Sequence, residues 1–208
     1  WSGTSVQNKK SREGAAIGRE ARAFGVGVVL GPAINIKRSP LCGRNFEYYS
    51  EDPLLAGKLA AGFIRGAEGE GVGTSLKHFA VNNQETLRMS VSAEVDERAL
   101  HELYLRPFEI AVKEGAPSTV MCSYNRINGV YASENRMLLT RILREQWGFD
   151  GLVMSDWGAV YRRPAGVAAG LDLEMPSSGG VTDREIVRAV RAGRLDAVSY
   201  THLTLPTN

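Results

Sequence analysis

The feature of this sequence that most restricts its fold is the regular alternation of helix-like segments with short apolar runs. Apolar residues recur with helical spacing at residues 12–24, 54–70, 96–115, 135–148 and 184–197. Between these segments lie short, mainly apolar runs at residues 25–32, 71–79, 118–124, 151–157 and 170–176. Such runs are typical of strands that are buried on both faces and joined by helices in a parallel sheet. The sequence therefore predicts an α/β fold.

The number of strands restricts which parallel fold is possible. About five strands are visible in 208 residues, whereas a closed (β/α)8 barrel typically needs about 250 residues. We therefore expect a (β/α)8 TIM-barrel-type domain that is incomplete and lacks one or more N-terminal strands. A doubly wound open sheet is the alternative. Its dinucleotide-binding fingerprint is absent, because the glycines of GVGVVLG surround a strand and do not follow one at a turn into a helix.

Local signals mark where two of the helices begin and end. Ser50 or Asp52 is expected to cap the second helix, which Pro53 starts. Pro107 is expected to kink or split the third helix, because proline lacks the N–H that a helix interior needs. Gly115 is placed to end that helix.

Charge and composition argue against several classes of partner. The 25 basic and 23 acidic side chains are spread along the chain and indicate neither a nucleic-acid surface nor an anionic-lipid surface. No apolar run approaches the ~20 residues of a membrane span. Cys42 and Cys122 lack metal-type spacing, and the three histidines form no ligand pair, so we expect neither a metal nor a cofactor. No targeting segment is recognisable, and no cellular location is predicted.

Polar side chains stand at the C-terminal end of each apolar run. They are Asn35, Arg38, Arg44, Asn45 and Glu47 after the first run, Lys77 and His78 after the second, Ser123, Tyr124 and Asn125 after the third, Ser155, Asp156 and Trp157 after the fourth, and Glu174 at the fifth. In parallel α/β folds these ends lie on one face of the sheet, where catalytic groups gather. We therefore expect a concave polar site that holds Asp156 near two or three cations and two aromatic rings.

This set of residue types favours a sugar as the ligand. Lysine and arginine form charge-assisted hydrogen bonds, and a carboxylate accepts hydrogen bonds from hydroxyls. An indole offers an apolar surface for the C–H face of a pyranose ring. Phosphate is disfavoured, because no glycine-rich anion nest opens a helix in this sequence.

Several stretches of the chain resemble glycoside hydrolase family 3, the β-glucosidase-like enzymes. They are GPAINIKRSPLCGRNFEYYSEDP, SLKHFAVNNQETLR, STVMCSYNRINGVYASEN, GFDGLVMSDWGAV and AAGLDLEMP, in family order between about residues 12 and 196. A lone SDW would be weak, but the ordered set is highly specific. The resemblance implies an N-terminal (β/α)8-type barrel that works with a following α/β sandwich domain. It also implies retaining hydrolysis of terminal β-linked glucose or related sugars.

The resemblance implies a role for particular residues. Asp156 matches the nucleophile that forms a covalent glycosyl-enzyme, and it must be ionised to do so. We expect nearby Lys77, His78 and Arg44 to stabilise its charge. The residues that match glycone-pocket positions are Arg44, Lys77, His78, Arg88 and Tyr124, and Trp157 would form a wall of the pocket.

The sequence departs from the family pattern in two respects. The family's general acid/base usually comes from the domain after the barrel, and a glycone-binding aspartate near the barrel's start has no counterpart here. The N-acetylhexosaminidase branch, which takes its proton donor from a histidine-containing loop, is disfavoured because AVNNQETLR lacks that histidine. We expect residues 1–197 to form the partial barrel domain. Residues 198–208 differ in composition and are expected to be a non-native or read-through tail.

Each candidate also has a structural interpretation. Asp156 could cap a helix, and Lys77 could form an ion pair with Glu47 or Asp156. His78 could be a core histidine, and Arg44 could be solvated instead of being oriented by Glu47. For Arg88 and Tyr124 the two interpretations are evenly balanced, Trp157 could be core, and Glu174 is expected to pack or pair. A non-catalytic carbohydrate-binding module is the alternative function, and an enzyme of phosphorylated substrates is a third.

Overall fold

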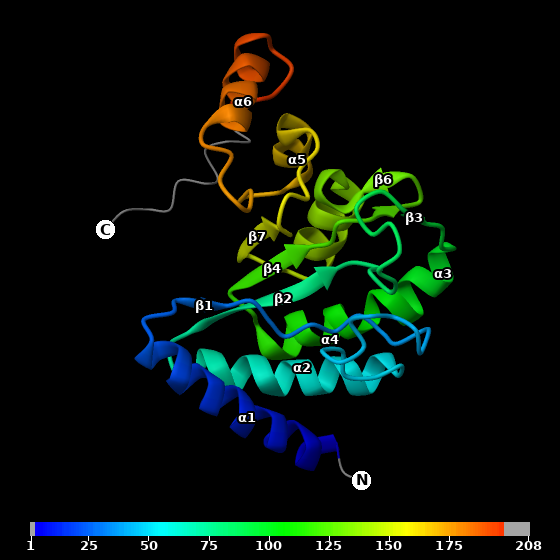
Figure 1. The fold of residues 1–208 in the computed structure, drawn as a ribbon, viewed down its shortest axis with the longest axis vertical. Helices are drawn as coiled ribbons and strands as arrows, with labels where there is room; N and C mark the ends of the chain where they lie inside the picture. The colour runs from blue at the N-terminus through cyan, green and yellow to red at the C-terminus, as the bar shows by residue number, and fades with distance from the viewer. Residues whose placement is uncertain (1–2, 198–208) are drawn as a thin grey trace.

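The computed structural model describes residues 3–197 of the chain, and its central sheet has four parallel strands. They are β1 (Val28–Val29), β2 (Gly73–Phe79), β4 (Thr119–Cys122) and β7 (Leu152–Ser155), in the spatial order β1-β2-β4-β7. Each strand pairs in parallel with its neighbour, and a helix follows each strand along the chain (Figure 1). This is the helix-connected parallel sheet that the sequence predicts. The expected tail, residues 198–208, lies outside the described residues.

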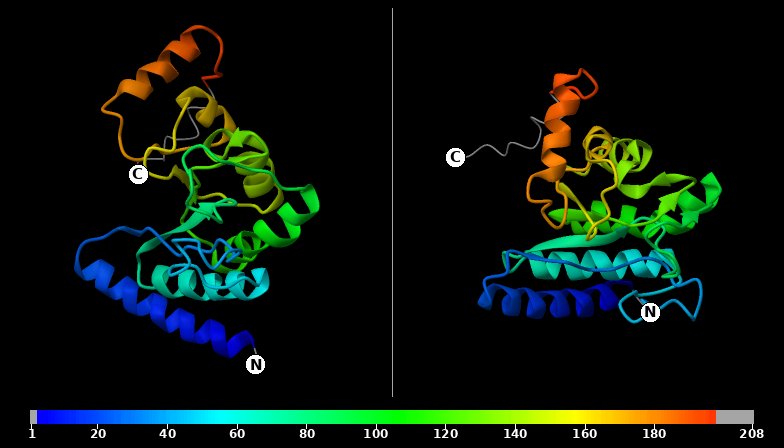
Figure 2. Two further views of the ribbon diagram at one scale, coloured as in Figure 1. Left: turned by 45° about the vertical axis from the view of Figure 1, so that its right-hand side comes forward. Right: turned by 45° about the horizontal axis from the view of Figure 1, so that its top comes forward.

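Helices pack against this sheet in successive β/α units. They are α1 (Gly3–Ala23), α2 (Pro53–Glu68), α3 (Glu97–Ala99), the π-helix η1 (Leu100–Tyr104), α4 (Arg106–Gly115), the 3-10 helix η2 (Ala132–Glu134), the π-helix η3 (Met137–Gln146), α5 (Arg163–Ala169) and α6 (Val181–Arg191). Helices α2 and α4 lie beside the sheet, with α1 outside α2, and α6 lies at the opposite end of the molecule (Figures 1 and 2). The five predicted helical segments appear in the predicted order.

Helix α1 packs closely on α2 because glycines stand at the contact. A Cβ added at Gly14 of α1 would lie 2.2 Å from the carbonyl oxygen of Phe63 in α2. One added at Gly66 of α2 would lie 2.0 Å from the carbonyl oxygen of Ser11 in α1. The two backbones therefore approach to a distance that excludes larger side chains at these positions.

The core lies between the strands and the inner helices. Phe79 of β2 and Phe108 of α4 are both fully buried, with ring centroids 5.3 Å apart. The ring of Trp147, at the end of η3, lies 5.7 Å from that of Phe79. Three elements thus meet in one aromatic cluster, which fixes β2 against the helices and so positions the C-terminal end of β2.

The cap predicted for α2 is present, and the third predicted helix ends at Gly115 as expected. Asp52 accepts hydrogen bonds from the N–H groups of Leu54 and Leu55, at 2.7 and 3.2 Å. The segment 96–115 splits just before Pro107, as predicted, into α3, η1 and α4. Gly115 is the last residue of α4, but the left-handed residue that follows is Ala116, at φ 52°.

Two of the predicted buried strands are wrong in extent or burial. In the segment 25–32, only Val28–Val29 pairs with β2, and Val26, Val28 and Leu30 are 42%, 37% and 38% exposed. This run is exposed because β1 forms an edge of the described sheet. In the segment 170–176, the ladder is reduced to one bridge, between Met154 and Leu173.

The structure also contains elements that the sequence did not indicate. A small sheet of β3 (Ser92–Ala93), β5 (Arg126–Ile127) and β6 (Val130–Tyr131) lies at the C-terminal ends of the main strands (Figure 1). Its strands are two residues long, which is too short for a periodic apolar pattern to reveal them. The short helix α5 follows β7 and was also missed.

Candidate active site

Asp156 lies directly after β7 and is the acid on which the site is centred. The residue is 5% exposed. Its Oδ1 accepts a hydrogen bond from the backbone N–H of Trp157 at 2.7 Å. Its Oδ2 is buried and has no hydrogen-bond partner among residues 3–197. A buried carboxylate oxygen without a partner is costly unless a ligand or solvent completes it, so this atom is available for chemistry.

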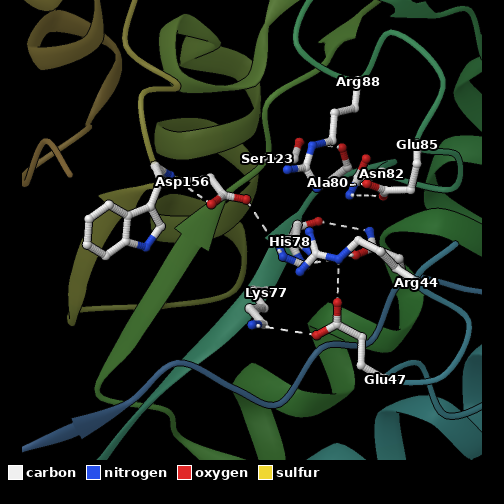
Figure 3. Close-up of polar contacts among 12 residues, drawn as sticks. Arg44, Glu47, Lys77, His78, Ala80, Asn82, Glu85, Arg88, Ser123 and Asp156 are labelled. Carbon is white, nitrogen blue, oxygen red and sulfur yellow. Dashed lines mark hydrogen bonds and ion pairs between the residues drawn. The ribbon is translucent and has the colours of Figure 1, made fainter. Parts of the chain in front are cut away.

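His78, from the C-terminal end of β2, faces this free oxygen. Its Nε2 lies 3.7 Å from Asp156 Oδ2, and the residue is 1% exposed (Figure 3). Burial, together with the positive charges of Arg44, Lys77 and Arg88, holds the pKa of His78 well below its ordinary value of 6.5. The expectation that His78 helps to stabilise the Asp156 charge as a cation is therefore wrong. It is a neutral hydrogen-bonding group at neutral pH.

Lys77 and His78 both reach the site because β2 is irregular at this point. Successive side chains of a regular strand point to opposite faces, so only one of the two would be expected there. The pairing of β2 with β4 shifts register between Leu76 and Phe79, and the peptide bonds Lys77–His78 and Phe79–Ala80 are cis. A register shift of this kind redirects side chains next to functional sites.

Glu47 links two cations that come from different segments. The Arg44 Nε donates a hydrogen bond to Glu47 Oε1, and Lys77 Nζ lies 3.6 Å from Glu47 Oε2 (Figure 3). All three side chains are less than one-fifth exposed. Burial opposes the charge of Arg44, but the hydrogen bond to Glu47 raises its pKa. The proposed orientation of Arg44 by Glu47, and the ion pair of Lys77 with Glu47, are both present.

Arg88 and Tyr124 form a second part of the site. The Arg88 guanidinium carbon lies 4.8 Å from the centroid of the Tyr124 ring, and its Nη1 donates to Glu85 Oε2 at 2.7 Å. Tyr124 is buried, and burial together with the charge of Asp156 raises its pKa to about 12. The phenol is therefore protonated near the carboxylate and can act as a donor.

Trp157 and Glu174 were the remaining candidates, and the structure places one at the surface and the other in contact with neighbouring residues. Trp157 is 52% exposed, so it is not a core residue. Glu174 Oε2 lies 3.7 Å from Arg163 Nε and accepts a hydrogen bond from the Thr182 hydroxyl. Glu174 thus pairs with its own surroundings, as expected.

Other polar residues of the site were missed by sequence reasoning. The Tyr48 hydroxyl donates to the Asn82 backbone carbonyl at 3.1 Å, and Asn82 Nδ2 contacts Glu85 Oε1 at 3.4 Å. Glu85 precedes Arg88 by three residues, a spacing typical of an ion pair, and that signal could have identified it. Figure 3 shows Asn82, Glu85 and Arg88 beside His78.

Three other features of residues 3–197 bear on the kinds of site that this part of the chain can form. No group of three or more His, Cys, Asp or Glu residues in this range is arranged to hold a metal ion. No helix of the described part is long and apolar enough to cross a membrane. An open groove of about 530 Å³ lies between α5 and α6, lined in part by Tyr161, Pro164 and Arg188. It includes none of the residues predicted to form the site.

The fold and the site define a class of protein. Parallel strands joined by helices, with an acid and several cations at their C-terminal ends, form an α/β domain of the TIM-barrel type. The chain belongs to glycosyl hydrolase family 3: the model of that family's N-terminal domain matches residues 4–199.

Characterised relatives and solved structures agree with this assignment. The chain is 59% identical over 184 residues to thermostable beta-glucosidase B of Acetivibrio thermocellus, covering 88% of this chain and 24% of the relative. It is 58% identical over 180 residues to an exo-alpha-(1->6)-L-arabinopyranosidase of Bifidobacterium longum, covering 86% and 24%. The structure of beta-glucosidase 3B from Thermotoga neapolitana in complex with alpha-D-glucose superposes with a TM-score of 0.92 at 48% identity, covering 95% and 28%. The chain thus spans about a quarter of the length of these proteins.

Proposed function

We propose that this chain is part of the barrel domain of a retaining, β-glucosidase-like glycoside hydrolase in which Asp156 is the nucleophile. The observation that carries the proposal is the buried Oδ2 of Asp156, which has no hydrogen-bond partner among the described residues and lies 3.7 Å from His78 Nε2, with Arg44, Lys77 and Arg88 nearby. Family membership and the names of the relatives support the same chemistry.

In the proposed first step, Asp156 Oδ2 attacks the anomeric carbon, and the bond to the leaving oxygen breaks while a second carboxyl group protonates that oxygen. The product of this step is a covalent glycosyl ester of Asp156. The Trp157 N–H holds Oδ1, so the other oxygen is directed towards the substrate. In the second step, the second carboxylate takes a proton from water, which attacks the same carbon from the leaving-group side and releases Asp156 with net retention of configuration.

The remaining residues would bind the sugar ring. Arg44, Lys77 and Arg88 are charged donors, and a hydroxyl that accepts from a charged donor forms a stronger bond than one that accepts from a neutral donor. Glu47 and Glu85 hold these cations in place before the substrate arrives. Pre-organised donors lose less conformational entropy on binding. Tyr124 would also bind a sugar hydroxyl, and the exposed ring of Trp157 would form one wall of the pocket.

The second carboxyl group of the mechanism is proposed to come from a following α/β sandwich domain. Retaining hydrolysis requires this group about 5 to 5.5 Å from the nucleophile. The acids described near the site are already engaged, since Glu47 and Glu85 bind arginines and Glu174 contacts Arg163 and Thr182. Residues 1–197 are accordingly assigned to a partial barrel domain. On this proposal the 208-residue chain alone turns over substrate poorly.

Exposed apolar side chains on the site-forming loops support a partner surface there. Leu41 and Phe46 flank Arg44 and are 90% and 86% exposed, and Leu87 precedes Arg88 and is 73% exposed. Apolar side chains grouped on functional loops are typical of surfaces that another domain or a ligand covers.

The sugar is proposed to be a terminal β-linked glucose or a pyranose of related shape. The relatives bear the names of a beta-glucosidase and of an L-arabinopyranosidase. To identify the preferred sugar, kcat/KM of the longer parent protein would be compared for an aryl β-D-glucoside and an aryl α-L-arabinopyranoside.

The decisive test is covalent trapping in the longer parent protein. A 2-deoxy-2-fluoro-β-glucoside with a good leaving group should inactivate the enzyme, and peptide mapping should find the label on Asp156. The variant Asp156→Asn should take up no label and lose turnover by a factor on the order of 10⁴ or more. Label on Glu174 would reassign the nucleophile. Sugar binding without label or turnover would favour the non-catalytic module.

A further inference from the structure

The side chain of Asn35 is buried against His78 and contacts it three times. Asn35 Nδ2 donates to the His78 backbone carbonyl at 2.9 Å, and the His78 backbone N–H donates to Asn35 Oδ1 at 3.0 Å. The imidazole Nδ1 lies 3.3 Å from the same Oδ1. The two residues are 2% and 1% exposed.

The two contacts with the His78 backbone identify which atom of the Asn35 amide is the oxygen and which is the nitrogen. A backbone N–H only donates and a backbone carbonyl only accepts, so Oδ1 must face the His78 N–H and Nδ2 must face its carbonyl. Asn35 lies two residues after Ala33, which pairs with Lys77. Backbone pairing therefore holds the side-chain amide of Asn35 next to His78. The orientation of Asn35 therefore does not depend on the imidazole.

The fixed amide determines the tautomer of the ring. Oδ1 can only accept, so the imidazole nitrogen that faces it must carry the proton. A neutral ring has one proton, which leaves Nε2 with its lone pair directed towards the site. Nε2 lies 3.7 Å from Asp156 Oδ2, and in this tautomer both atoms are hydrogen-bond acceptors.

We propose that Asn35 is a positioning residue that holds His78 as the Nδ1–H tautomer, so that Nε2 accepts a hydrogen bond from a ligand hydroxyl. His78 thereby distinguishes a hydroxyl, which donates, from a fluorine, an ether or a keto oxygen, which does not. The neighbouring cations Arg44, Lys77 and Arg88 only donate, so they cannot make this distinction. The ligand assignment rests on the proposed function, whereas the tautomer does not.

Nitrogen NMR of the 208-residue chain tests the tautomer without requiring catalysis. The chain has three histidines, and the variant His78→Gln identifies the signals of this one by their loss. At pH 7 we expect a protonated, pyrrole-type Nδ1 and an unprotonated, pyridine-type Nε2. A protonated Nε2 with a bare Nδ1, or an averaged pair of signals, would overturn the proposal.

The variant Asn35→Asp provides a second measurement on the same atoms. It keeps the acceptor that faces Nδ1 but places a carboxylate beside the ring, so the imidazole should become protonated at higher pH than in the unsubstituted chain. The groups that face this ring are Asn35, Asp156, the three cations and the edge of Tyr48, at a ring distance of 6.2 Å. An unchanged titration would show that Asn35 does not contact the imidazole.

Sugar binding separates this proposal from the proposed function. Glucose should shift the Nε2 signal, whereas monodeoxy or monofluoro glucose lacking the donated hydroxyl should bind about 10- to 100-fold more weakly. If Nε2 is unprotonated but no sugar shifts it, the tautomer stands and the carbohydrate assignment of this site fails. If sugars bind and Nε2 carries the proton, the proposed function stands and this inference fails.

Discussion

Glu68, far from the proposed active site, offers a sharp test of how the barrel is held together. It stands in the last turn of α2 and accepts four hydrogen bonds at the N-terminal ends of two strands. Oε1 accepts from the Thr74 N–H at 2.9 Å, the Thr74 hydroxyl at 2.6 Å and the Ser118 N–H at 2.7 Å. Oε2 accepts from the Ser118 hydroxyl at 2.6 Å. One carboxylate thus joins α2 to the starts of β2 and β4.

The replacement Glu68→Ala should destabilise the chain by about 3 kcal/mol. Thr74 is fully buried, so its N–H and hydroxyl lose their acceptor where water does not replace it. An unsatisfied buried donor costs about 1 to 3 kcal/mol. Ser118 is exposed, so water replaces its partner at little cost. For a domain of this size, 3 kcal/mol lowers Tm by about 6 to 12 °C.

Glu68→Gln is the matched control. Its carbonyl oxygen can accept the three bonds that Oε1 accepts now, and its amide can donate to the Ser118 hydroxyl. Only the charge assistance is lost, so we expect a cost of about 1 kcal/mol. Urea unfolding followed by circular dichroism measures both variants. The reasoning is refuted if Glu68→Ala stays within 0.5 kcal/mol of the unsubstituted chain, or if the two variants are equally destabilised.

Three further outcomes are expected. In the longer parent protein, Glu47→Gln should lower kcat/KM for an aryl glucoside by about 10- to 100-fold, because Arg44 and Lys77 lose the charge that orients them. Because the pKa of His78 is lowered in the folded chain, the unfolded chain binds a proton that the folded chain does not. The stability of the unsubstituted chain should therefore fall as pH drops below 6.5, by up to about 1.4 kcal/mol per pH unit from this group. In His78→Gln this part of the pH dependence should vanish. Ala116→Gly should stabilise by about 0.5 to 1 kcal/mol, because glycine adopts the left-handed φ of 52° without strain.

Matched variants and contrary outcomes make these measurements decisive. Glu51→Gln, at an exposed position, should leave kcat/KM unchanged, and an equal loss in both glutamate variants would show that Glu47 has no special role. Ala16→Gly, in the exposed interior of α1, should destabilise by about 1 kcal/mol, opposite in sign to Ala116→Gly. For His78, equal slopes of unfolding free energy against pH between 5.5 and 6.5 would show that its proton affinity does not change on folding.

The balance of charges explains why a histidine is useful at this point in the site. Three cations and one buried carboxylate surround His78, and a protonated imidazole would form an ion pair with Asp156. Keeping the ring neutral leaves Asp156 Oδ2 free of an ion pair. The site thus combines charged donors with a neutral imidazole next to the acid.

Much of the site was predictable because strand ends in parallel α/β folds share one face. The positions of Asp156, His78 and Lys77 follow from the apolar runs that precede them, and Glu47 follows from its spacing to Arg44. The charge of His78 was not predictable, because it depends on burial and on cations from other segments. Asn35 was visible as a polar residue, but its contact with His78 requires two segments 43 residues apart to pair.

The sequence by itself determined the order of the longer helices and the four parallel strands, the α/β class and the residue types available for chemistry, because these depend on local periodicity and composition. The tertiary structure alone decided the register shift of β2 that brings Lys77 and His78 to one site. It also decided that the 25–32 run lies at an edge of the described sheet. Both are properties of strand pairing, which joins residues far apart in the chain and leaves no local pattern.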